Sequence, residues 1–175
     1  MREKRIESRS VYKGKILDLK VDTVVLPDGA RTEREVVAHP GAVAVVSVTD
    51  DNEIVLIRQF RYPVDEVLWE IPAGKLEPEE DPLECAKREL SEETGFGAEE
   101  WQNMSVFYTT PGFSDEIMYL YSARGLYKDI READSDEFIE VHKIPMDDVL
   151  EQIKSGVIKD AKTIIGVLLT KNRLY

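Results

Sequence analysis

Cysteine and histidine, which often build reactive or metal-binding sites, are scarce in this sequence. The one cysteine, Cys85, excludes an intrachain disulfide and any zinc site made of several cysteines. The two histidines, His39 and His142, leave little room for a histidine-based metal site. We assign no functional role to these three residues, so carboxylates become the candidate ligands for any metal.

Long apolar segments are also missing from the sequence. The longest apolar-rich run, from Ala42 to Val48, is far shorter than the roughly 20 residues that a membrane-spanning helix needs. The first ten residues, MREKRIESRS, contain no apolar stretch of the kind found in signal peptides. The sequence therefore predicts a cytoplasmic protein that has no membrane partner.

Positive charge is in deficit, because 23 Lys and Arg residues face 35 Asp and Glu residues, a formal net charge of −12. Binding to nucleic acid requires a surplus of basic side chains that neutralise phosphates, so nucleic acid is not an expected partner. A chain of 175 residues with 42% hydrophobic content, 10 Gly and 8 Pro is typical of a folded domain with a small accessory element.

Apolar periodicity and turn residues predict an α/β fold with a mixed sheet, preceded by a small antiparallel β element. Residues 2–37 are β-rich, with a hairpin turn at Pro27-Asp28-Gly29. A second hairpin is expected around Asp50-Asp51-Asn52. The other expected elements are strands near 67–73, 104–110, 117–125 and 138–145, a helix over 82–94, and two helices after Met146 that are separated at Ser155-Gly156.

The helix expected over 82–94 carries an unusual group of carboxylates. Its ends are marked by typical cap residues, namely Asp81, Pro82, Glu84 and Gly95. Glu89, Glu92 and Glu93 follow one another at i, i+3 and i+4, so their side chains share one face and repel one another. A divalent cation such as Mg²⁺ would turn this repulsion into attraction, whereas the alternative is a solvated acidic face.

The wider sequence favours the metal site over the solvated face. Residues 74–96, GKLEPEEDPLECAKRELSEETGF, fit the pattern G-x5-E-x7-R-E-U-x-E-E-x-G-U, in which U is apolar. The specified positions are filled by Gly74, Glu80, Arg88, Glu89, Leu90, Glu92, Glu93, Gly95 and Phe96. Seven fixed positions match by chance on the order of once in 10⁸ windows at ordinary residue frequencies. The segment resembles the Nudix box, the signature of hydrolases that cleave a nucleoside diphosphate linked to another moiety.

The resemblance implies a Nudix-type α/β/α sandwich and a loop-helix-loop that holds two or three Mg²⁺ or Mn²⁺ ions. Glu89, Glu93 and the backbone carbonyl of Ala73 are the implied direct ligands. Glu92 is implied as a ligand or an outer-shell partner, and we count it among the catalytic residues. Glu80 and Arg88 are expected to form a supporting ion pair.

Three further segments, RQFRYPV, EIPAGK and YTTPGFSDE, resemble the ADP-ribose pyrophosphatase subfamily. The resemblance implies that Arg61 contacts the diphosphate and that Glu70 lies near the adenine or the ribose. Arg58 is a less certain member, because an Arg at the end of a buried strand often pairs with a structural carboxylate. The resemblance also implies pocket-lining roles for Thr110, Pro111, Gly112 and Glu116. The alternative is that Pro111-Gly112 is a turn that only ends a strand.

The subfamily takes its catalytic base from a loop remote from the box, and the matching segment here is residues 132–138, EADSDEF. We expect Glu137 to be the base, or to bind a metal when the loop closes, with Asp134 and Asp136 as alternatives. A solvated acidic loop is the competing interpretation.

The N-terminal element, residues 1–40, resembles a segment that family members exchange between subunits, whereas residues 41–175 correspond to the Nudix domain. The resemblance therefore implies a homodimer in which Arg34 and Glu35 reach the partner's substrate. Some relatives place aromatic rings that stack on adenine where this chain has Lys13-Gly14-Lys15-Ile16. Tyr12 is the nearest aromatic residue to this stretch. Because the stacking rings of those relatives are absent, the sequence does not predict strict selectivity for adenine.

These observations together predict a Mg²⁺-dependent hydrolase that splits ADP-ribose into AMP and ribose 5-phosphate. The first alternative is a hydrolase of another nucleoside diphosphate sugar or of a dinucleotide. The second alternative, a module that binds ADP-ribose without turnover, is disfavoured by the intact acidic residues of the box.

Overall fold

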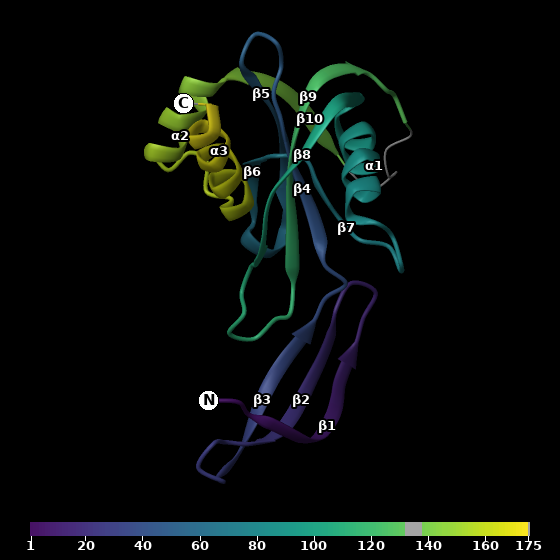
Figure 1. The fold of residues 1–175 in the computed structure, drawn as a ribbon, viewed down its shortest axis with the longest axis vertical. Helices are drawn as coiled ribbons and strands as arrows, with labels where there is room; N and C mark the ends of the chain where they lie inside the picture. The colour runs from purple at the N-terminus through teal and green to yellow at the C-terminus, as the bar shows by residue number, and fades with distance from the viewer. Residues whose placement is uncertain (132–137, 175) are drawn as a thin grey trace. The chain divides into compact units, whose positions relative to one another are not determined.

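The computed structural model describes residues 1–131 and 138–174, and its contacts divide the chain into two units (Figure 1). The N-terminal unit comprises Met1–Gly41 together with Phe107–Met118. The larger unit comprises Ala42–Val106 and Tyr119–Tyr175. The N-terminal unit thus includes a segment from the middle of the chain, which the sequence did not predict.

The N-terminal unit is built on an antiparallel sheet in the order β1 (Lys4–Lys13), β2 (Asp18–Val25) and β3 (Arg31–Ala38). The turn between β2 and β3 contains Gly29 at φ +91°, a conformation that glycine adopts without strain. The N–H of Leu26 donates to the carbonyl of Ala30 at 2.8 Å and closes the hairpin. The expected hairpin at residues 27–29 is confirmed.

The strands of the larger unit form two sheets, which are ordered β10-β5-β6 and β7-β4-β9-β8. A short 3-10 helix, η1 (Tyr62–Val64), connects β5 to β6. The strand bounds are β4 Ala42–Ser47, β5 Glu53–Arg61, β6 Glu66–Glu70, β7 Ala73–Lys75, β8 Phe96–Tyr108, β9 Ile117–Lys128 and β10 Ile139–Pro145.

Helices cover the strands from two sides, with α1 (Pro82–Thr94) on one side and α2 (Met146–Lys154) and α3 (Ala161–Leu174) on the other (Figure 1). Every residue of β4 is buried, and Val43 and Val45 join Leu90 of α1 in one apolar cluster. Removal of each large aliphatic side chain from water contributes about 1.5–3 kcal/mol to the stability of the fold, and this free energy drives the layering. The α/β class and the N-terminal antiparallel element agree with expectation.

The expected hairpin across Asp50-Asp51-Asn52 is wrong, although a turn is present there. The N–H of Thr49 donates to the carbonyl of Glu53 at 2.9 Å, and one isolated bridge joins Val48 to Ile54. Beyond that bridge β4 and β5 belong to different sheets. Each strand is largely buried; β4 pairs with β7 and β9, and β5 pairs with β10 as well as with β6, which turn chemistry at residues 50–52 does not reveal. The strand expected from 104 also begins earlier, at Phe96.

Helix α1 begins and ends where its cap residues predict. Asp81 Oδ1 accepts hydrogen bonds from the backbone N–H groups of Leu83, at 2.9 Å, and Glu84, at 3.2 Å. Gly95 ends the helix at φ +71°, in the left-handed region. Both ends of the helix that carries the acidic residues are therefore defined by local interactions. Among the helices of residues 1–131 and 138–174, none is long and apolar enough to cross a bilayer.

Close packing of α3 on β4 generates a first prediction, about Gly166. A Cβ at Gly166 would lie 2.6 Å from Val46 Cγ2 and 3.2 Å from Ile71 Cδ1. Gly166→Val should lower the free energy of unfolding by about 1–3 kcal/mol, because the extra atoms force the helix from the sheet. Urea unfolding followed by circular dichroism measures the change. A matched Gly112→Ala variant, whose Cβ would meet nothing within 4 Å, should unfold like the parent. Equal stability of both variants would contradict the packing argument.

Candidate active site

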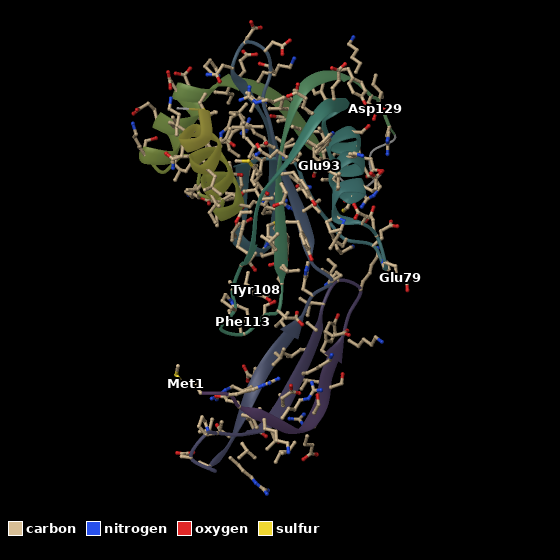
Figure 2. The ribbon with its side chains drawn as sticks, viewed as in Figure 1. Met1, Glu79, Glu93, Tyr108, Phe113 and Asp129 are labelled. Carbon is tan, nitrogen blue, oxygen red and sulfur yellow. The ribbon has the colours of Figure 1, made fainter. Side chains whose placement is uncertain are left out.

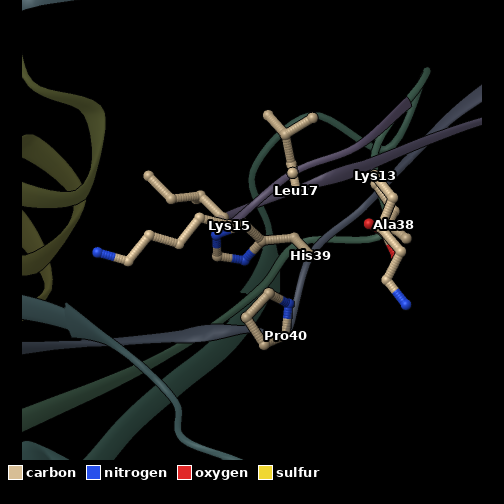
Figure 3. Close-up of a pocket in the computed structure, with 9 residues that line it drawn as sticks. Lys13, Lys15, Leu17, Ala38, His39 and Pro40 are labelled. Atoms are coloured by element: carbon tan, nitrogen blue, oxygen red, sulfur yellow. The ribbon is translucent and has the colours of Figure 1, made fainter.

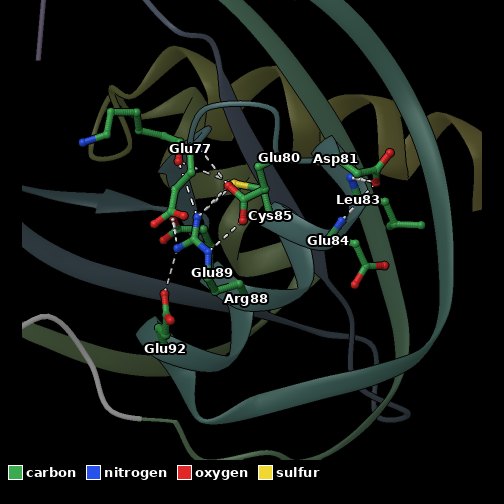
Figure 4. Close-up of polar contacts among 10 residues, drawn as sticks. Glu77, Glu80, Asp81, Leu83, Glu84, Cys85, Arg88, Glu89 and Glu92 are labelled. Carbon is green, nitrogen blue, oxygen red and sulfur yellow. Dashed lines mark hydrogen bonds and ion pairs between the residues drawn. The ribbon is translucent and has the colours of Figure 1, made fainter.

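Arg88 lies at the centre of the acidic residues on α1 and the preceding loop (Figure 4). Its Nε and Nη2 donate to the two carboxylate oxygens of Glu80 at 2.9 and 3.1 Å. Its Nη1 donates to Glu89 Oε1 at 2.8 Å and to Glu92 Oε2 at 2.9 Å. The guanidinium therefore joins three carboxylates, and the expected Glu80–Arg88 ion pair is present.

The ion pair fixes the charge state of Glu80. The Arg88 hydrogen bonds lower the pKa of Glu80 to about 2, so this carboxylate is ionised throughout the neutral range. The same contacts raise the pKa of Arg88. Nearby Cys85 is buried, and burial together with Glu80 raises the pKa of its thiol. A protonated, buried thiol fits the absence of an assigned role for Cys85.

Glu89 and Glu93 pack against the backbone of the loop that precedes the helix. Glu93, 6% exposed, accepts a hydrogen bond from the N–H of Ala73 at 2.9 Å and lies between α1 and the strands (Figure 2). Glu89 lies directly on Gly74, where a Cβ would be 1.8 Å from the Glu89 Cδ atom. Only glycine leaves room for the carboxylate in this position. The structure therefore brings Ala73, Glu89 and Glu93 together, as the resemblance implies.

The donor set is chemically suited to a divalent cation. Glu89 and Glu92 contact the same guanidinium nitrogen, which shows that the two carboxylates can share one positive charge. Carboxylate and carbonyl oxygens are the ligands that Mg²⁺ and Mn²⁺ prefer. In the part of the chain that the structure describes, no three acidic, histidine or cysteine side chains gather closely enough to form a complete metal site. The metal-ligand roles of Ala73, Glu89, Glu92 and Glu93 remain predictions.

Arg61 and Glu70, both expected near the substrate, form a bidentate ion pair. Arg61 Nε and Nη2 donate to the two oxygens of Glu70 at 2.7 and 2.8 Å. Glu70 is 1% exposed and also accepts a hydrogen bond from Lys162 of α3. The sequence did not identify Lys162, and no motif could have done so, because it lies 92 residues from Glu70 along the chain.

Arg58 takes the structural alternative that the sequence left open. Its Nη1 donates to Glu140 of β10 at 3.0 Å, and its guanidinium lies 5.2 Å from the centre of the Trp69 ring. These contacts join the three strands β10, β5 and β6 through side chains. They account for Arg58 without a role in binding.

Four of the expected pocket residues belong to the N-terminal unit, in the segment that ends β8 and begins β9. Thr110, Pro111 and Gly112 are exposed in a turn in which the carbonyl of Thr110 accepts from the N–H of Ser114 at 3.0 Å. Glu116 accepts a hydrogen bond from Thr109 Oγ1 at 2.5 Å. The turn is therefore ordered, whereas its role in binding remains a prediction.

Arg34 and Glu35 lie on β3 of the same unit. Arg34 Nη2 and Nε donate to the oxygens of Glu3 at 2.8 and 3.1 Å, whereas Glu35 is exposed opposite Val21 of β2. The hydrogen bond from Arg34 lowers the pKa of Glu3. In this structure Arg34 is thus held by its own chain.

A cavity of about 300 Å³ opens at the turn between β1 and β2 (Figure 3). It is lined by Lys13, Gly14, Lys15, Ile16, Leu17, Asp18, Ala38, His39 and Pro40. The ring of Tyr12 lies against Gly14, where a Cβ would be 2.6 Å from Tyr12 Cε1. The stretch where some relatives place aromatic rings thus lines a cavity here, and the ring of Tyr12 packs against Gly14 of the same turn. Glu137, Asp134 and Asp136, the candidate bases, lie outside the described residues.

Comparison with known families and proteins agrees with this geometry. The NUDIX domain profile matches residues 38–165, and the profile of the nucleoside diphosphate sugar hydrolase N-terminal domain matches residues 3–37. The chain is 46% identical to the methanol dehydrogenase activator of Bacillus methanolicus, over 94% of this chain and 90% of that protein. It is 44% identical to the ADP-ribose pyrophosphatase of Bacillus subtilis strain 168, over 95% of this chain and 91% of that protein.

A solved structure supports the fold. The crystal structure of an ADP compounds hydrolase superposes with a TM-score of 0.90 and covers 99% of this chain and 95% of its own. Its sequence identity of 21% means that this likeness shows the fold alone. The family match, the arrangement of the box residues and the identity to curated relatives lead to one conclusion: the chain belongs to the NUDIX family and is a Nudix pyrophosphohydrolase.

Proposed function

We propose that this protein hydrolyses the diphosphate of ADP-ribose to AMP and ribose 5-phosphate. The observation that carries the proposal is the clustering of Glu89 and Glu92 on one cationic nitrogen, with Glu93 held against Ala73. Identity to an ADP-ribose pyrophosphatase over most of both chains supports this choice of substrate. In the reaction, water attacks one phosphorus, a proton leaves the water, and the bridging P–O bond breaks.

The chain's own residues have distinct tasks in this proposal. Glu89, Glu92, Glu93 and the carbonyl of Ala73 hold two or three Mg²⁺ or Mn²⁺ ions. Bound divalent cations supply charge neutralisation of the diphosphate and lower the pKa of a water molecule. Arg61 contacts the diphosphate as a fixed cation, and Glu137 accepts the proton from water. Thr110, Pro111, Gly112 and Glu116 are proposed to contact the substrate, and Glu70 is proposed to act on it through Arg61. We retain the cytoplasm as the proposed location.

A second substrate class has its own support. The profile that matches residues 3–37 describes nucleoside diphosphate sugar hydrolases, a class broader than ADP-ribose hydrolases. Among the residues that the structure describes, the cavity lined by Lys13, Gly14, Lys15 and Ile16 has no Phe, Tyr or Trp in its lining to stack on adenine, and its one aromatic ring is the imidazole of His39. Hydrolysis of another nucleoside diphosphate sugar is therefore the alternative function.

A product assay tests the choice between these substrates. The purified protein with Mg²⁺ should convert ADP-ribose to AMP and ribose 5-phosphate, which chromatography detects. Its kcat/KM for ADP-ribose should exceed that for GDP-mannose and UDP-glucose, and EDTA should abolish turnover because the carboxylates then lack their cations. Absence of AMP would refute the proposed reaction, and a higher kcat/KM for another sugar would favour the alternative.

Replacing one carboxylate tests the proposed metal role. Glu93→Gln should lower kcat by about 10² or more, because an anionic ligand is lost while the amide oxygen still accepts from Ala73. Initial rates of AMP release at saturating Mg²⁺ measure the effect. Glu84→Gln is the matched control, since Glu84 lies on the same helix, is 64% exposed and pairs with Lys87. Turnover of Glu93→Gln close to that of the control would reject the assignment.

We also propose that the N-terminal unit forms a homodimer in which the β1–β3 element is exchanged, so that Arg34 and Glu35 serve the partner's site. Every residue of β1 is exposed. Ile6, Val11 and Tyr12 are 45%, 48% and 59% exposed, so the sheet presents apolar side chains to solvent. An edge strand of this kind is a template for association with a second copy.

Sedimentation tests the dimer. The protein should sediment at twice the 20.0 kDa of one chain, and Val11→Asp should shift it to the monomer because a charge enters the apolar contact. Val157→Asp makes the same change at a residue of the larger unit that is 51% exposed, and it should leave the dimer intact. A monomeric parent protein would refute the exchange.

A further inference from the structure

Four charged side chains of the larger unit alternate in sign from the start of α3 to the end of β5. Lys162 Nζ donates to Asp160 Oδ1 at 3.0 Å and also to Glu70 Oε2. Glu70 in turn accepts from Arg61 through both oxygens, at 2.7 and 2.8 Å. The row therefore reads Asp160, Lys162, Glu70 and Arg61, and each inner member is shared between two partners.

Burial and backbone contacts hold this row in one geometry. The side chains of Glu70 and Lys162 are 1% and 14% exposed. Asp160 Oδ2 accepts from the N–H of Thr163 at 2.9 Å and from its hydroxyl at 2.6 Å. The same hydroxyl oxygen accepts from the N–H of Ile71 at 2.8 Å. The start of α3 is thus tied to the strand end that carries Glu70, and Lys162 has little freedom to move.

Arg61 and Lys162 compete for the carboxylate of Glu70. Burial alone raises the pKa of Glu70, but the hydrogen bonds and charges of Arg61 and Lys162 outweigh it and hold the pKa below its usual range. Without Lys162, Arg61 would be the only cation paired with the ionised Glu70 carboxylate in this row. With Lys162 present, the carboxylate is shared between the two cations, so its attraction for Arg61 is weaker. Arg61, whose side chain is 37% exposed, is then less completely paired and can attract other anions.

Arg61 also interacts electrostatically with one acidic residue of the Nudix box, Glu93. Glu93 acts electrostatically on Arg61 and contributes to its raised pKa, after the larger effect of Glu70. The arginine therefore lies between a buried carboxylate and a proposed metal ligand. In the proposed function a diphosphate bound at the box contacts this guanidinium, and the strength of that contact depends on how tightly Glu70 holds Arg61.

We propose that Lys162 is a positioning residue that acts through Glu70 to keep the Arg61 guanidinium oriented toward the substrate's diphosphate and less tightly paired with that carboxylate. The inference rests on the proposed diphosphate hydrolysis and adds a residue of the C-terminal helix to its machinery. Lys162 itself need not touch the substrate.

Lys162→Met, which keeps the apolar stem and removes the charge, tests this role. It should raise KM for ADP-ribose about tenfold and change kcat less than twofold, the size expected when one charge-assisted contact weakens. Lys162→Arg should restore KM to within about threefold of the parent. A purely structural role would instead lower the melting temperature and the active fraction without changing KM.

Lys159→Met is the matched control. Lys159 precedes α3 by two positions and forms an exposed ion pair with Glu66 of β6 at 2.7 Å, outside the row. Its removal deletes the same charge from the same segment, so any long-range effect of net charge appears equally in both variants. KM should stay at the parent value, and an equal rise in KM for both variants would overturn the inference.

A double variant decides whether Lys162 acts through Glu70. In a Glu70→Gln background the buried carboxylate charge is gone, so adding Lys162→Met should leave KM unchanged. A further tenfold loss in the double variant would mean that Lys162 binds the substrate directly, and it would overturn the positioning role.

A binding measurement separates this inference from the proposed reaction. The dissociation constant of ADP, a diphosphate that needs no turnover, is measured by calorimetry with Mg²⁺ present. Lys162→Met should weaken ADP binding about tenfold, and the Lys159→Met control should not. A parent protein that fails to release AMP refutes ADP-ribose hydrolysis, whereas an unchanged ADP affinity in Lys162→Met refutes the role of Lys162.

Discussion

The geometry of the acidic site depends on the contacts of one guanidinium, that of Arg88. Three carboxylates approach one another on α1 and its preceding loop, and without a cation their mutual repulsion would spread them apart. Arg88 holds both oxygens of Glu80, which ties the loop to the helix, and it holds Glu89 and Glu92 on the same nitrogen. The five donors of an arginine in a planar fork make this possible, whereas a lysine offers a point charge.

The formal net charge of −12 therefore says little about the field at the site. Arg88, Arg61 and Lys162 each pair with carboxylates that are largely shielded from solvent, where charges interact more strongly than at the surface. Most other acidic residues are exposed and screened by salt. The acidic composition argues against nucleic acid as a partner. It is compatible with binding of a small anion at a site where cationic side chains are held in place.

Local signals in the sequence predict local structure well here. The cap residues at Asp81 and Gly95 locate α1, and the turn chemistry at 27–29 locates the hairpin of β2 and β3, because both depend on contacts between near neighbours. The turn at 50–52 was equally clear, but β4 and β5 enter different sheets, since β4 pairs with β7 and β9 and β5 pairs with β10, all of which lie far along the chain. Lys162 escaped prediction for the same reason, as its partner Glu70 lies far away along the chain.

Glu70 shows how the contacts of a predicted site residue can limit the roles open to it. Both of its oxygens accept hydrogen bonds from cations, and its side chain is almost completely buried. A carboxylate so engaged has little capacity left for a ribose hydroxyl or an adenine amine. Any influence of Glu70 on the substrate then passes through Arg61, whose orientation it sets and whose charge it partly neutralises. In the role proposed for Lys162, the division of Glu70 between Arg61 and Lys162 sets the strength of diphosphate binding, so a buried carboxylate acts on the anion through a neighbouring arginine.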